Sequence, residues 1–241
     1  MTGESVISVK NMYKKFGQFI ANNDLNFNVY KGEIFGFLGA NGAGKTTAIK
    51  ILCGLQTPTS GEISVAGYDV YKQTEEIKSN IGYMSQKFSL YEDLTVAENY
   101  RFFAGVYRVP RKEIKPRMEE SLKRVGLLKQ KDKLISALPL GWKQKLAFSV
   151  ASIHRPEIIF LDEPTSGVDP VARRNFWEQI FMAADEGTTV FVTTHYMDEA
   201  EYCNRVSIMD KGKIIALDKP SQLKKEHNVD NMFDLFLNLV R

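Results

Sequence analysis

The feature that most constrains this chain is a glycine-rich loop between an apolar run and a helical run. Residues 39–46 read G-x-x-x-x-G-K-[ST], directly after the apolar run 34–38 and at the start of a helical run over residues 45–53. Glycines let the backbone turn tightly and approach phosphate oxygens, while successive N–H groups and the helix N-terminus supply positive potential. Because the strand, the loop and the helix are all indicated, the sequence predicts a nucleotide site here.

Separate contacts are expected within this loop. Lys45 would reach the β- and γ-phosphates, the Thr46 hydroxyl would ligate Mg²⁺, and Thr47 would add a phosphate contact from the first helical turn. The full set expected to hold the nucleotide is Gly39, Ala40, Asn41, Gly42, Ala43, Gly44, Lys45, Thr46 and Thr47. A glycine-rich turn that merely precedes a helix is the alternative, and both flanks argue against it.

Apolar, β-rich runs alternate with helical stretches along the chain. The expected buried strands are residues 34–38, 81–85, 158–161, 189–193 and 206–209, and the expected helices are residues 45–53, 96–107, 111–125, 142–153 and 171–185. This alternation predicts an α/β fold with a mostly parallel sheet. Residues 6–11 and 25–29 instead alternate like antiparallel strands, and a further pair is expected around residues 63–66. They predict a small antiparallel β layer beside the parallel core.

The domain organisation is expected to be simple. Residues 94–150 carry mostly helical signals and are expected to form a helical insertion. A C-terminal helix is expected over residues 229–240, packed on its own subunit because it lacks the basic polar face of a membrane-surface helix. No segment is rich enough in glycine and serine to separate independent domains, so residues 1–241 are predicted to form one domain.

Composition excludes several classes of protein. The chain has 241 residues, 44 % hydrophobic and 25 % charged, which argues against a disordered or disulfide-stapled chain. No apolar run approaches the roughly 20 residues of a spanning helix, and the start does not resemble a signal peptide, so we expect a cytosolic chain. Cys53 and Cys203 lack metal-ligand spacing and are expected to be core or half-buried thiols. A net charge of +3 is too mild to indicate nucleic-acid binding.

Two carboxylates and a histidine are expected at the ends of buried strands. Asp162 and Glu163 follow the run 158–161, and open α/β sheets bind ligands at the carboxyl ends of their strands. Asp162 is expected to hold Mg²⁺, and Glu163 to orient and deprotonate an attacking water. A loop cap or a salt bridge is the alternative for such a pair.

His195 ends the run 190–194, so its imidazole is expected on the same sheet edge, where a γ-phosphate contact is favoured over a structural role.

In chain order these segments form a recognisable pattern. It runs GANGAGKTT, then Ser85-Gln86, then FLDEPTSGVD over residues 160–169, then Thr194-His195. Over about residues 5–220 the chain resembles the ATP-binding subunit of an ATP-binding-cassette (ABC) transporter. The resemblance implies the P-loop NTPase core of an ABC ATPase. It also implies two subunits arranged head to tail, with ATP and Mg²⁺ between the phosphate loop of one and the signature segment of the other.

Individual roles follow from the same resemblance. Phe16 matches the aromatic that stacks on adenine, with Tyr13 as the alternative. Gln86 matches the residue that senses Mg²⁺ and the γ-phosphate and couples to the membrane subunits, and Asp169 matches the loop that communicates across the dimer. The resemblance thus implies a catalytic set of Glu163, His195 and Gln86, and a metal-binding set of Thr46, Gln86 and Asp162.

The signature segment departs from the family pattern. The usual sequence is LSGGQ, whereas this chain has Leu138, Pro139, Leu140, Gly141 and Trp142. Leu138, Gly141 and Trp142, together with Asp169, are still expected to contact ATP bound to the other subunit, in part through backbone N–H groups. A partner cassette whose hydrolysis is impaired is the alternative. The LPLGW variant resembles cassettes of the drug-exporter or ABC-2-type subgroup.

An aromatic helical stretch follows Gln86. Tyr100, Phe102, Phe103 and Tyr107 lie on it, as is typical of a helix packed on a core. The resemblance implies that this region borders the groove that receives a cytoplasmic helix of the membrane subunit. Some of these aromatic side chains are therefore expected to be partly exposed.

The resemblance implies an ATP-hydrolysing motor subunit, peripheral on the cytoplasmic face of a membrane, that dimerises on ATP with an identical or different cassette. Separate transmembrane permease subunits are expected as partners, export as the direction, and no nucleic acid as a partner. A soluble ABC ATPase of DNA repair or translation is the second class, disfavoured because such relatives carry a long coiled-coil insertion or two cassettes. A P-loop kinase or GTPase is the third, and the N-K-x-D motif of GTPases is not found.

Overall fold

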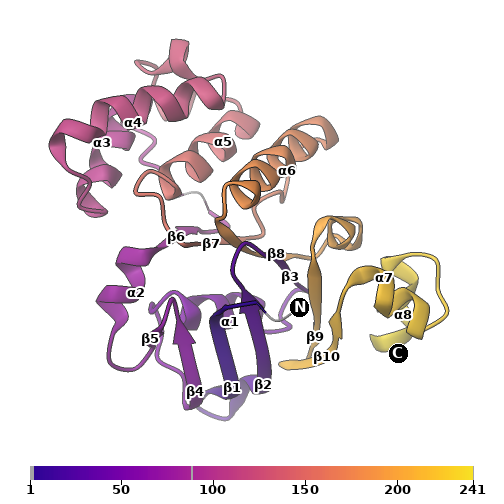
Figure 1. The fold of residues 1–241 in the computed structure, drawn as a ribbon. Helices are drawn as coiled ribbons and strands as arrows, with labels where there is room; N and C mark the ends of the chain where they lie inside the picture. The colour runs from indigo at the N-terminus through magenta and orange to yellow at the C-terminus, as the bar shows by residue number, and fades with distance from the viewer. Residues whose placement is uncertain (1–2, 88, 241) are drawn as a thin grey trace.

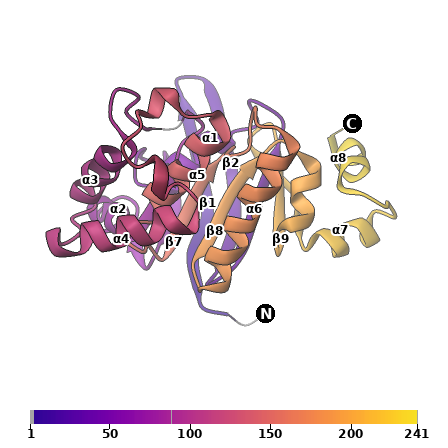
Figure 2. The same ribbon diagram turned by 90° about the horizontal axis from the view of Figure 1, so that it is seen from above.

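The computed structural model describes residues 3–87 and 89–240, which form two sheets and a set of covering helices (Figures 1 and 2). The strands are β1 (Ser5–Phe16), β2 (Phe19–Tyr30), β3 (Ile34–Gly39), β4 (Ser60–Val65), β5 (Tyr68–Asp69), β6 (Ile81–Met84), β7 (Ile158–Asp162), β8 (Thr189–Thr194), β9 (Arg205–Asp210) and β10 (Lys213–Asp218). The α-helices are α1 (Lys45–Leu52), α2 (Thr74–Asn80), α3 (Val96–Val106), α4 (Arg111–Arg124), α5 (Leu140–Ala151), α6 (Pro170–Asp185), α7 (Pro220–Glu226) and α8 (Met232–Val240). Three 3-10 helices complete the set: η1 (Leu128–Gln130), η2 (Ile135–Ala137) and η3 (Met197–Tyr202).

A six-stranded sheet in the order β10-β9-β3-β8-β7-β6 forms the centre, with every pair parallel except β10–β9. Successive side chains of β3 point to opposite faces of the sheet. Phe35 and Phe37 pack with α1 and the strands of the antiparallel sheet, whereas Ile34 and Leu38 pack with α5, α6 and η3. Strands covered on both sides must be apolar on both, which explains their unbroken apolar runs. The predicted α/β class is confirmed.

An antiparallel sheet in the order β2-β1-β4-β5 covers one face, and confirms the predicted second layer. β1 and β2 each have 12 residues, which is longer than the expected strands. The register shifts between Val9 and Met12 and again between Met12 and Lys14. Such irregularities break the alternation of apolar and polar residues, so the outer part of the hairpin carries no regular period-two pattern.

Helices α3, α4 and α5 share a third apolar cluster above the parallel sheet. Helices α3 and α4 lie within residues 94–150, where the helical insertion is expected, and α5 ends one residue beyond that range. Helix α5 begins at Leu140, two residues before the expected start, because Pro139 serves as its N-cap. On α3, Tyr100 is fully buried, whereas Phe102 and Val106 are 43 % and 58 % exposed. The aromatic stretch is therefore divided between the core and the surface.

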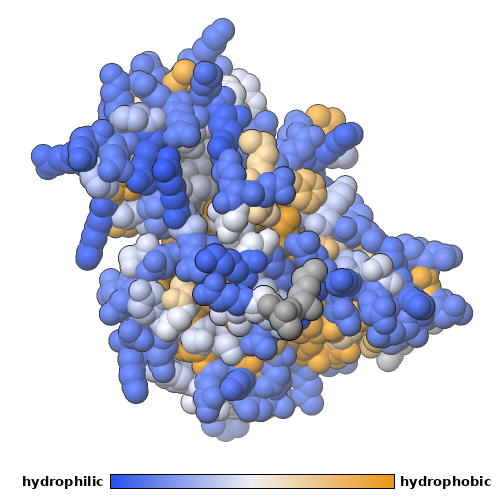
Figure 3. All heavy atoms as spheres, viewed as in Figure 1, coloured by the Kyte–Doolittle hydropathy of each residue, from blue (hydrophilic) through white to orange (hydrophobic). Residues whose placement is uncertain are grey.

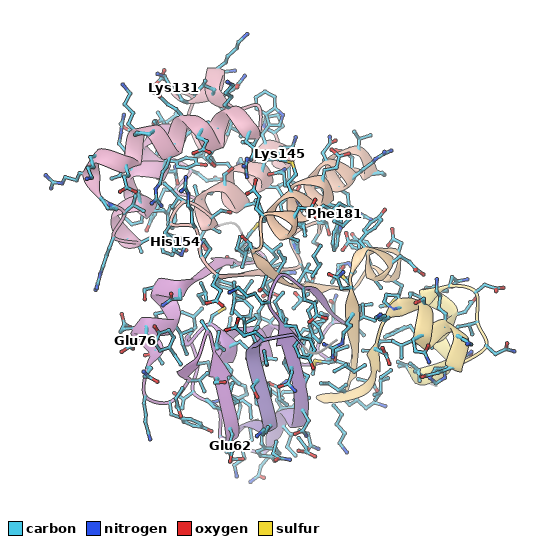
Figure 4. The ribbon with its side chains drawn as sticks, viewed as in Figure 1. Glu62, Glu76, Lys131, Lys145, His154 and Phe181 are labelled. Atoms are coloured by element: carbon cyan, nitrogen blue, oxygen red, sulfur yellow. The ribbon has the colours of Figure 1, made fainter. Side chains whose placement is uncertain are left out.

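His154, which follows α5, lies where the helical layer meets the sheet (Figure 4). Its ring stacks on Tyr107 at a centroid separation of 3.9 Å, and its Nε2–H donates to the Ile81 carbonyl at 2.9 Å. The tautomer is assigned from that carbonyl, which can only accept. Burial lowers the pKa of His154 to about 4, against a backbone hydrogen bond that raises it. The side chain is therefore a neutral structural contact between two layers.

The C-terminal helix α8 packs on the same chain, where Met232 and Leu235 are buried in the cluster that η3 and α6 share. Cys53 and Cys203 are free and buried, and burial raises the pKa of both thiols. Figure 3 shows a mainly hydrophilic face, with apolar residues reaching the surface between the antiparallel sheet and the C-terminal helices. Among the described residues, no helix combines the length and the apolar character that crossing a bilayer requires.

Candidate active site

The strand order brings four separate chain segments to one edge of the parallel sheet. β3 ends at Gly39, its neighbour β8 ends at Thr194, and β7 beyond it ends at Asp162. The register pairs Leu38 with Thr194 and Asp162 with Thr193, so the carboxyl ends of these strands are level. The loops that follow carry the phosphate loop, His195, Glu163 and, after β6, Gln86. An open α/β sheet binds ligands at this edge.

The phosphate loop encloses the Lys45 side chain. Its Nζ donates to the carbonyl oxygens of Gly39 at 2.7 Å and Ala40 at 3.1 Å, and the residue is 4 % exposed. Ala40, Asn41 and Gly42 are exposed at the tip of the loop, and Thr47 is half-buried one turn into α1. The loop carbonyls thus hold the ammonium group in the position where a phosphate would meet it.

Gly44 sits at the N-cap of α1 in a left-handed conformation, with φ 103° and ψ 2°. A Cβ there would lie 2.3 Å from the Ala21 carbonyl oxygen, so a close backbone approach as well as the dihedral angle demands glycine. Asn22 Nδ2 donates to the Gly44 carbonyl at 3.1 Å. The antiparallel sheet therefore fixes the start of α1, whose N–H groups face the phosphate site.

Glu163 is the centre of the polar network. Its Oε1 lies 3.3 Å from Lys45 Nζ, and its Oε2 accepts from Gln86 Nε2 at 3.1 Å and lies 3.1 Å from His195 Nδ1. Glu163 has φ 48°, a left-handed conformation that is uncommon for a residue with a side chain. Its N–H bonds to Thr193, to the hydroxyl at 2.9 Å and to the carbonyl at 3.1 Å. The structure thus brings all three residues of the predicted catalytic set together.

Asp162 faces a different group of oxygen atoms. Its Oδ1 accepts from Thr193 Oγ1 at 2.8 Å and from Thr46 Oγ1 at 3.3 Å. Burial raises the pKa of Asp162, with smaller lowering contributions from these two hydroxyl hydrogen bonds. A hydroxyl and a buried carboxylate are the hard oxygen donors that Mg²⁺ prefers, and Mg²⁺ commonly takes one or two protein ligands together with phosphate and water. Thr46 and Asp162 therefore fit this ion.

Other predicted residues lie apart from this network. Phe16, at the end of β1, is 46 % exposed with the Lys14 ammonium 4.9 Å above its ring. Asp169 caps α6, where its Oδ1 accepts from the N–H groups of Val171 and Ala172 at 3.0 and 2.9 Å. Neither residue has a contact with the phosphate loop among the hydrogen bonds and ion pairs of the described residues.

The signature residues lie at the start of α5. Leu138 is 5 % exposed within the apolar cluster of the helical layer, and Trp142 packs against that cluster, so Leu138 can offer a nucleotide only its backbone. Leu140 is 45 % exposed. Gly141 is half-buried, and a Cβ there would lie 3.1 Å from Ala172 Cβ on α6.

Sequence reasoning missed three residues that shape the site. Thr193 binds both Asp162 and the Glu163 N–H, Asn22 supports Gly44, and Gln144 of α5 donates to the Pro164 carbonyl, directly after Glu163. A hydroxyl at the polar end of the apolar run 190–194 was a usable signal for Thr193. Asn22 and Gln144 sit in ordinary strand and helix sequence, so only their tertiary contacts reveal them.

Comparison with known proteins identifies the family. The family profile described as "ABC transporter" matches residues 22–166, which cover more than half of the chain. The chain belongs to the ABC transporter family. Its fold agrees with a solved structure titled "Structure of ATP binding subunit of ABC transporter", with a TM-score of 0.88 and 27 % identity over 98 % of this chain and 99 % of that one. Within the family the chain matches the ATP-binding component.

Several relatives have names that mention multidrug transport, resistance or export. The "Probable multidrug ABC transporter ATP-binding protein YbhF" of Escherichia coli (strain K12) is 47 % identical over 96 % of this chain, which spans 40 % of that protein. The "Linearmycin resistance ATP-binding protein LnrL" of Bacillus subtilis (strain 168) is 36 % identical over 95 % of this chain and 74 % of its own length. The "Nod factor export ATP-binding protein I" of Ralstonia nicotianae is 34 % identical over 90 % of this chain and 68 % of that protein.

Proposed function

We propose that this chain is the ATP-hydrolysing motor of an exporter, which dimerises on ATP and drives separate transmembrane subunits from the cytoplasmic face of a membrane. One observation carries the proposal. A single buried carboxylate, that of Glu163, lies within 3.3 Å of Lys45 Nζ and at 3.1 Å from both Gln86 and His195. A base, a phosphate-binding cation and two polar partners at one edge of the sheet are suited to the hydrolysis of a phosphoanhydride.

Each side chain has a distinct part in the proposed reaction. Glu163 orients a water molecule and accepts its proton as the water attacks the γ-phosphate in line. Lys45 exchanges its loop carbonyls for phosphate oxygens and, with the N–H groups of the loop, neutralises the negative charge that builds up. His195 holds Glu163 through Nδ1 and presents the opposite side of its ring to the γ-phosphate. Gln86 donates to the same carboxylate oxygen. It would sense whether Mg²⁺ and the γ-phosphate occupy the site.

Thr46 and Asp162 would hold Mg²⁺, which supplies charge neutralisation on the β- and γ-phosphate oxygens when bound. Thr193 keeps Asp162 in place through its 2.8 Å hydrogen bond, and the same hydroxyl accepts from the Glu163 N–H. One threonine thus fixes the spacing between the metal-binding carboxylate and the base. Phe16, exposed at the end of β1, would stack on adenine.

A second cassette would complete the site. In this proposal the amides at the start of α5, with Gly141 and the exposed Leu140, face the γ-phosphate held by the other subunit, and Asp169 lies beside them. A relative of known structure, 27 % identical with a TM-score of 0.79 over 88 % of this chain and 98 % of that one, is titled as a dimer of an ATP-binding cassette in a post-hydrolysis state bound to ADP and Pi. The Gln144 hydrogen bond to Pro164 would link this segment to the loop after Glu163.

The membrane subunit would dock in a groove beside α2 and α3. This groove has a volume of about 590 Å³, and its lining includes Leu55, Tyr83, Phe103, Val106, Tyr107 and Arg108. Exposed apolar side chains around a concave surface are typical of a site that receives an amphipathic helix. Export as the direction of transport rests on the names of the relatives.

The test is the ATP hydrolysis rate of the purified chain as a function of its concentration, with Glu163→Gln as the inactive control. A rate that rises more steeply than linearly, and is lost in the control, is expected for a dimeric motor. ATP binding without hydrolysis at any concentration would instead favour a hydrolysis-impaired cassette that needs a different partner. The specific observation behind that second candidate is Pro139 and Leu140 in the signature segment.

A further inference from the structure

A buried ionic cluster lies behind the active-site edge, where no predicted site residue falls. Its centre is Glu199 of η3, which is fully buried. Glu199 Oε1 accepts a 2.6 Å hydrogen bond from the Thr165 hydroxyl, and Arg173 Nε of α6 lies 3.8 Å from the same oxygen. Thr165 is the second residue after Glu163 in the loop that leads to Asp169. One carboxylate therefore touches the loop after the proposed base and the first turns of α6.

The cluster also reaches His195. The Arg173 guanidinium lies 3.9 Å above the centre of the Tyr196 ring, and that ring lies 4.2 Å from the His195 ring. The Arg173 backbone N–H donates to the Asp169 carbonyl at 2.9 Å, in the first turn of α6. A short chain of side-chain contacts thus joins Thr165, Glu199, Arg173 and Tyr196 to the histidine, and the helix backbone joins Arg173 to Asp169, the residue expected at the dimer interface.

The cluster is poorly arranged for stability alone. Among the described residues, Glu199 Oε2 and Arg173 Nε have no hydrogen-bond partner, although both atoms are buried. A buried charged group with an unmet hydrogen bond destabilises a fold, and well-packed apolar residues of similar volume commonly do as well or better. Buried polar atoms without hydrogen-bond partners are expected mainly at functional sites, so this cluster is a candidate for a functional role.

We propose that Glu199 is a positioning residue for hydrolysis, an inference that rests on the proposed function of Glu163 and His195. Its carboxylate anchors Thr165, and so the loop after Glu163, on one side. On the other side it pairs with Arg173, which also lies 3.6 Å from Asp198 and whose guanidinium packs on the Tyr196 ring beside His195. The proposed base, the histidine and the start of α6 are thereby held in one arrangement.

The test compares Thr165→Val, which removes only the hydroxyl, with Thr165→Ser, which keeps it. Glu199→Gln removes the charge, and Glu186→Gln, an exposed partner of Arg124 away from the site, is the matched control. At saturating ATP we expect kcat to fall about 10- to 100-fold in Thr165→Val and Glu199→Gln. KM for ATP should stay within about threefold, since the phosphate loop is untouched. Thr165→Ser and Glu186→Gln should behave like the unchanged chain.

A second readout separates this proposal from the proposed function. The chain has three histidines, so the imidazole NMR signals of His195 can be resolved from those of His154 and His227. We expect the His195 signals to move in Thr165→Val and Glu199→Gln, but not in Thr165→Ser, while the His227 signals stay. If the unchanged chain hydrolyses no ATP and the His195 signals still move, the motor function fails and the positioning contact stands. Unmoved His195 signals, or an unaltered kcat in an active enzyme, would overturn the role of Glu199.

Discussion

Two helix N-termini in this molecule are expected to bind nucleotide, and their surroundings are very different. Helix α1 follows a glycine-rich loop whose lysine is 4 % exposed and bonded to loop carbonyls, and Glu163, His195 and Gln86 gather beside it. Helix α5 follows Pro139 and begins with Leu140, which is 45 % exposed. Among the described residues, no hydrogen bond or ion pair joins the signature residues to a catalytic side chain. In the proposed function the first region holds the base, the cation and the metal ligands, whereas the second offers a surface to another cassette.

The largest effect that separates the two regions is expected from Glu163→Gln. The amide keeps the shape of the side chain but cannot accept the proton, so the steady-state ATP hydrolysis rate should fall about 10²- to 10⁴-fold with ATP binding retained. Glu157→Gln, at the residue directly before the same strand, is the control and should leave the rate unchanged. An undiminished rate in Glu163→Gln would remove this residue from the mechanism and with it the main contrast with α5.

A matched pair of glycine substitutions tests the comparison at the two helix starts. In Gly44→Ala the new Cβ would meet the Ala21 carbonyl oxygen at 2.3 Å, at φ 103°, so we expect a loss of about 2 kcal/mol or more in unfolding free energy. Nucleotide binding should be lost as well. In Gly141→Ala the nearest atom is Ala172 Cβ at 3.1 Å, and the better helix propensity of alanine offsets the tight contact to within about 1 kcal/mol.

Chemical denaturation and binding of a fluorescent ATP analogue by the isolated chain measure both variants. Binding that survives in Gly44→Ala would show that the loop tolerates displacement. Weakened binding by the isolated Gly141→Ala chain would show that α5 acts on the nucleotide of its own subunit.

Acid should loosen the attachment of the helical layer through His154. Its folded pKa is about 4, against an ordinary value of 6.5, because burial disfavours the imidazolium. The unfolded chain therefore binds the proton more readily. The stability contribution is complete above pH 6.5 and is lost as the pH falls toward 4, by at most roughly 3 kcal/mol.

The measurement is the Tm of the unchanged chain and of His154→Gln, which retains a donor for the Ile81 carbonyl but does not titrate. The decrease in Tm between pH 7 and pH 5 should be smaller in the variant. An equal decrease in both proteins would assign the acid sensitivity to other groups.

The smallest expected effect comes from restoring the serine and the glycine of the usual signature. Pro139→Ser with Leu140→Gly would add a hydroxyl at the N-cap of α5 and clear the approach to its amides, so we expect the ATP hydrolysis rate at equal chain concentration to rise about three- to tenfold. The single change Leu140→Gly clears the approach to the amides without adding the hydroxyl, so it separates the two effects. A rate that falls instead would mean that the LPLGW segment is adapted to its partner rather than weakened.

Local pattern was enough to predict most of the fold and much of the site. These predictions rested on contiguous features: the phosphate loop, the five apolar runs of the parallel sheet and the residues that end those runs. Glycine spacing indicates a tight turn, and an unbroken apolar run indicates a buried strand. The hairpin of β1 and β2 was underestimated because bulges interrupt its alternation. The start of α5 was placed two residues late because a proline can precede a helix without being its first residue.

The sequence by itself determined that a phosphate-binding loop would share a sheet edge with Asp162, Glu163 and His195, because parallel strands place their carboxyl ends together. Only the tertiary structure decided which atoms meet there. Thr193 joins Asp162 to the Glu163 backbone, and Glu199 meets Thr165, because the strand register and the packing of η3 bring residues 30 or more positions apart into contact. Register depends on the packing of whole elements, and no local spacing of residue types encodes it.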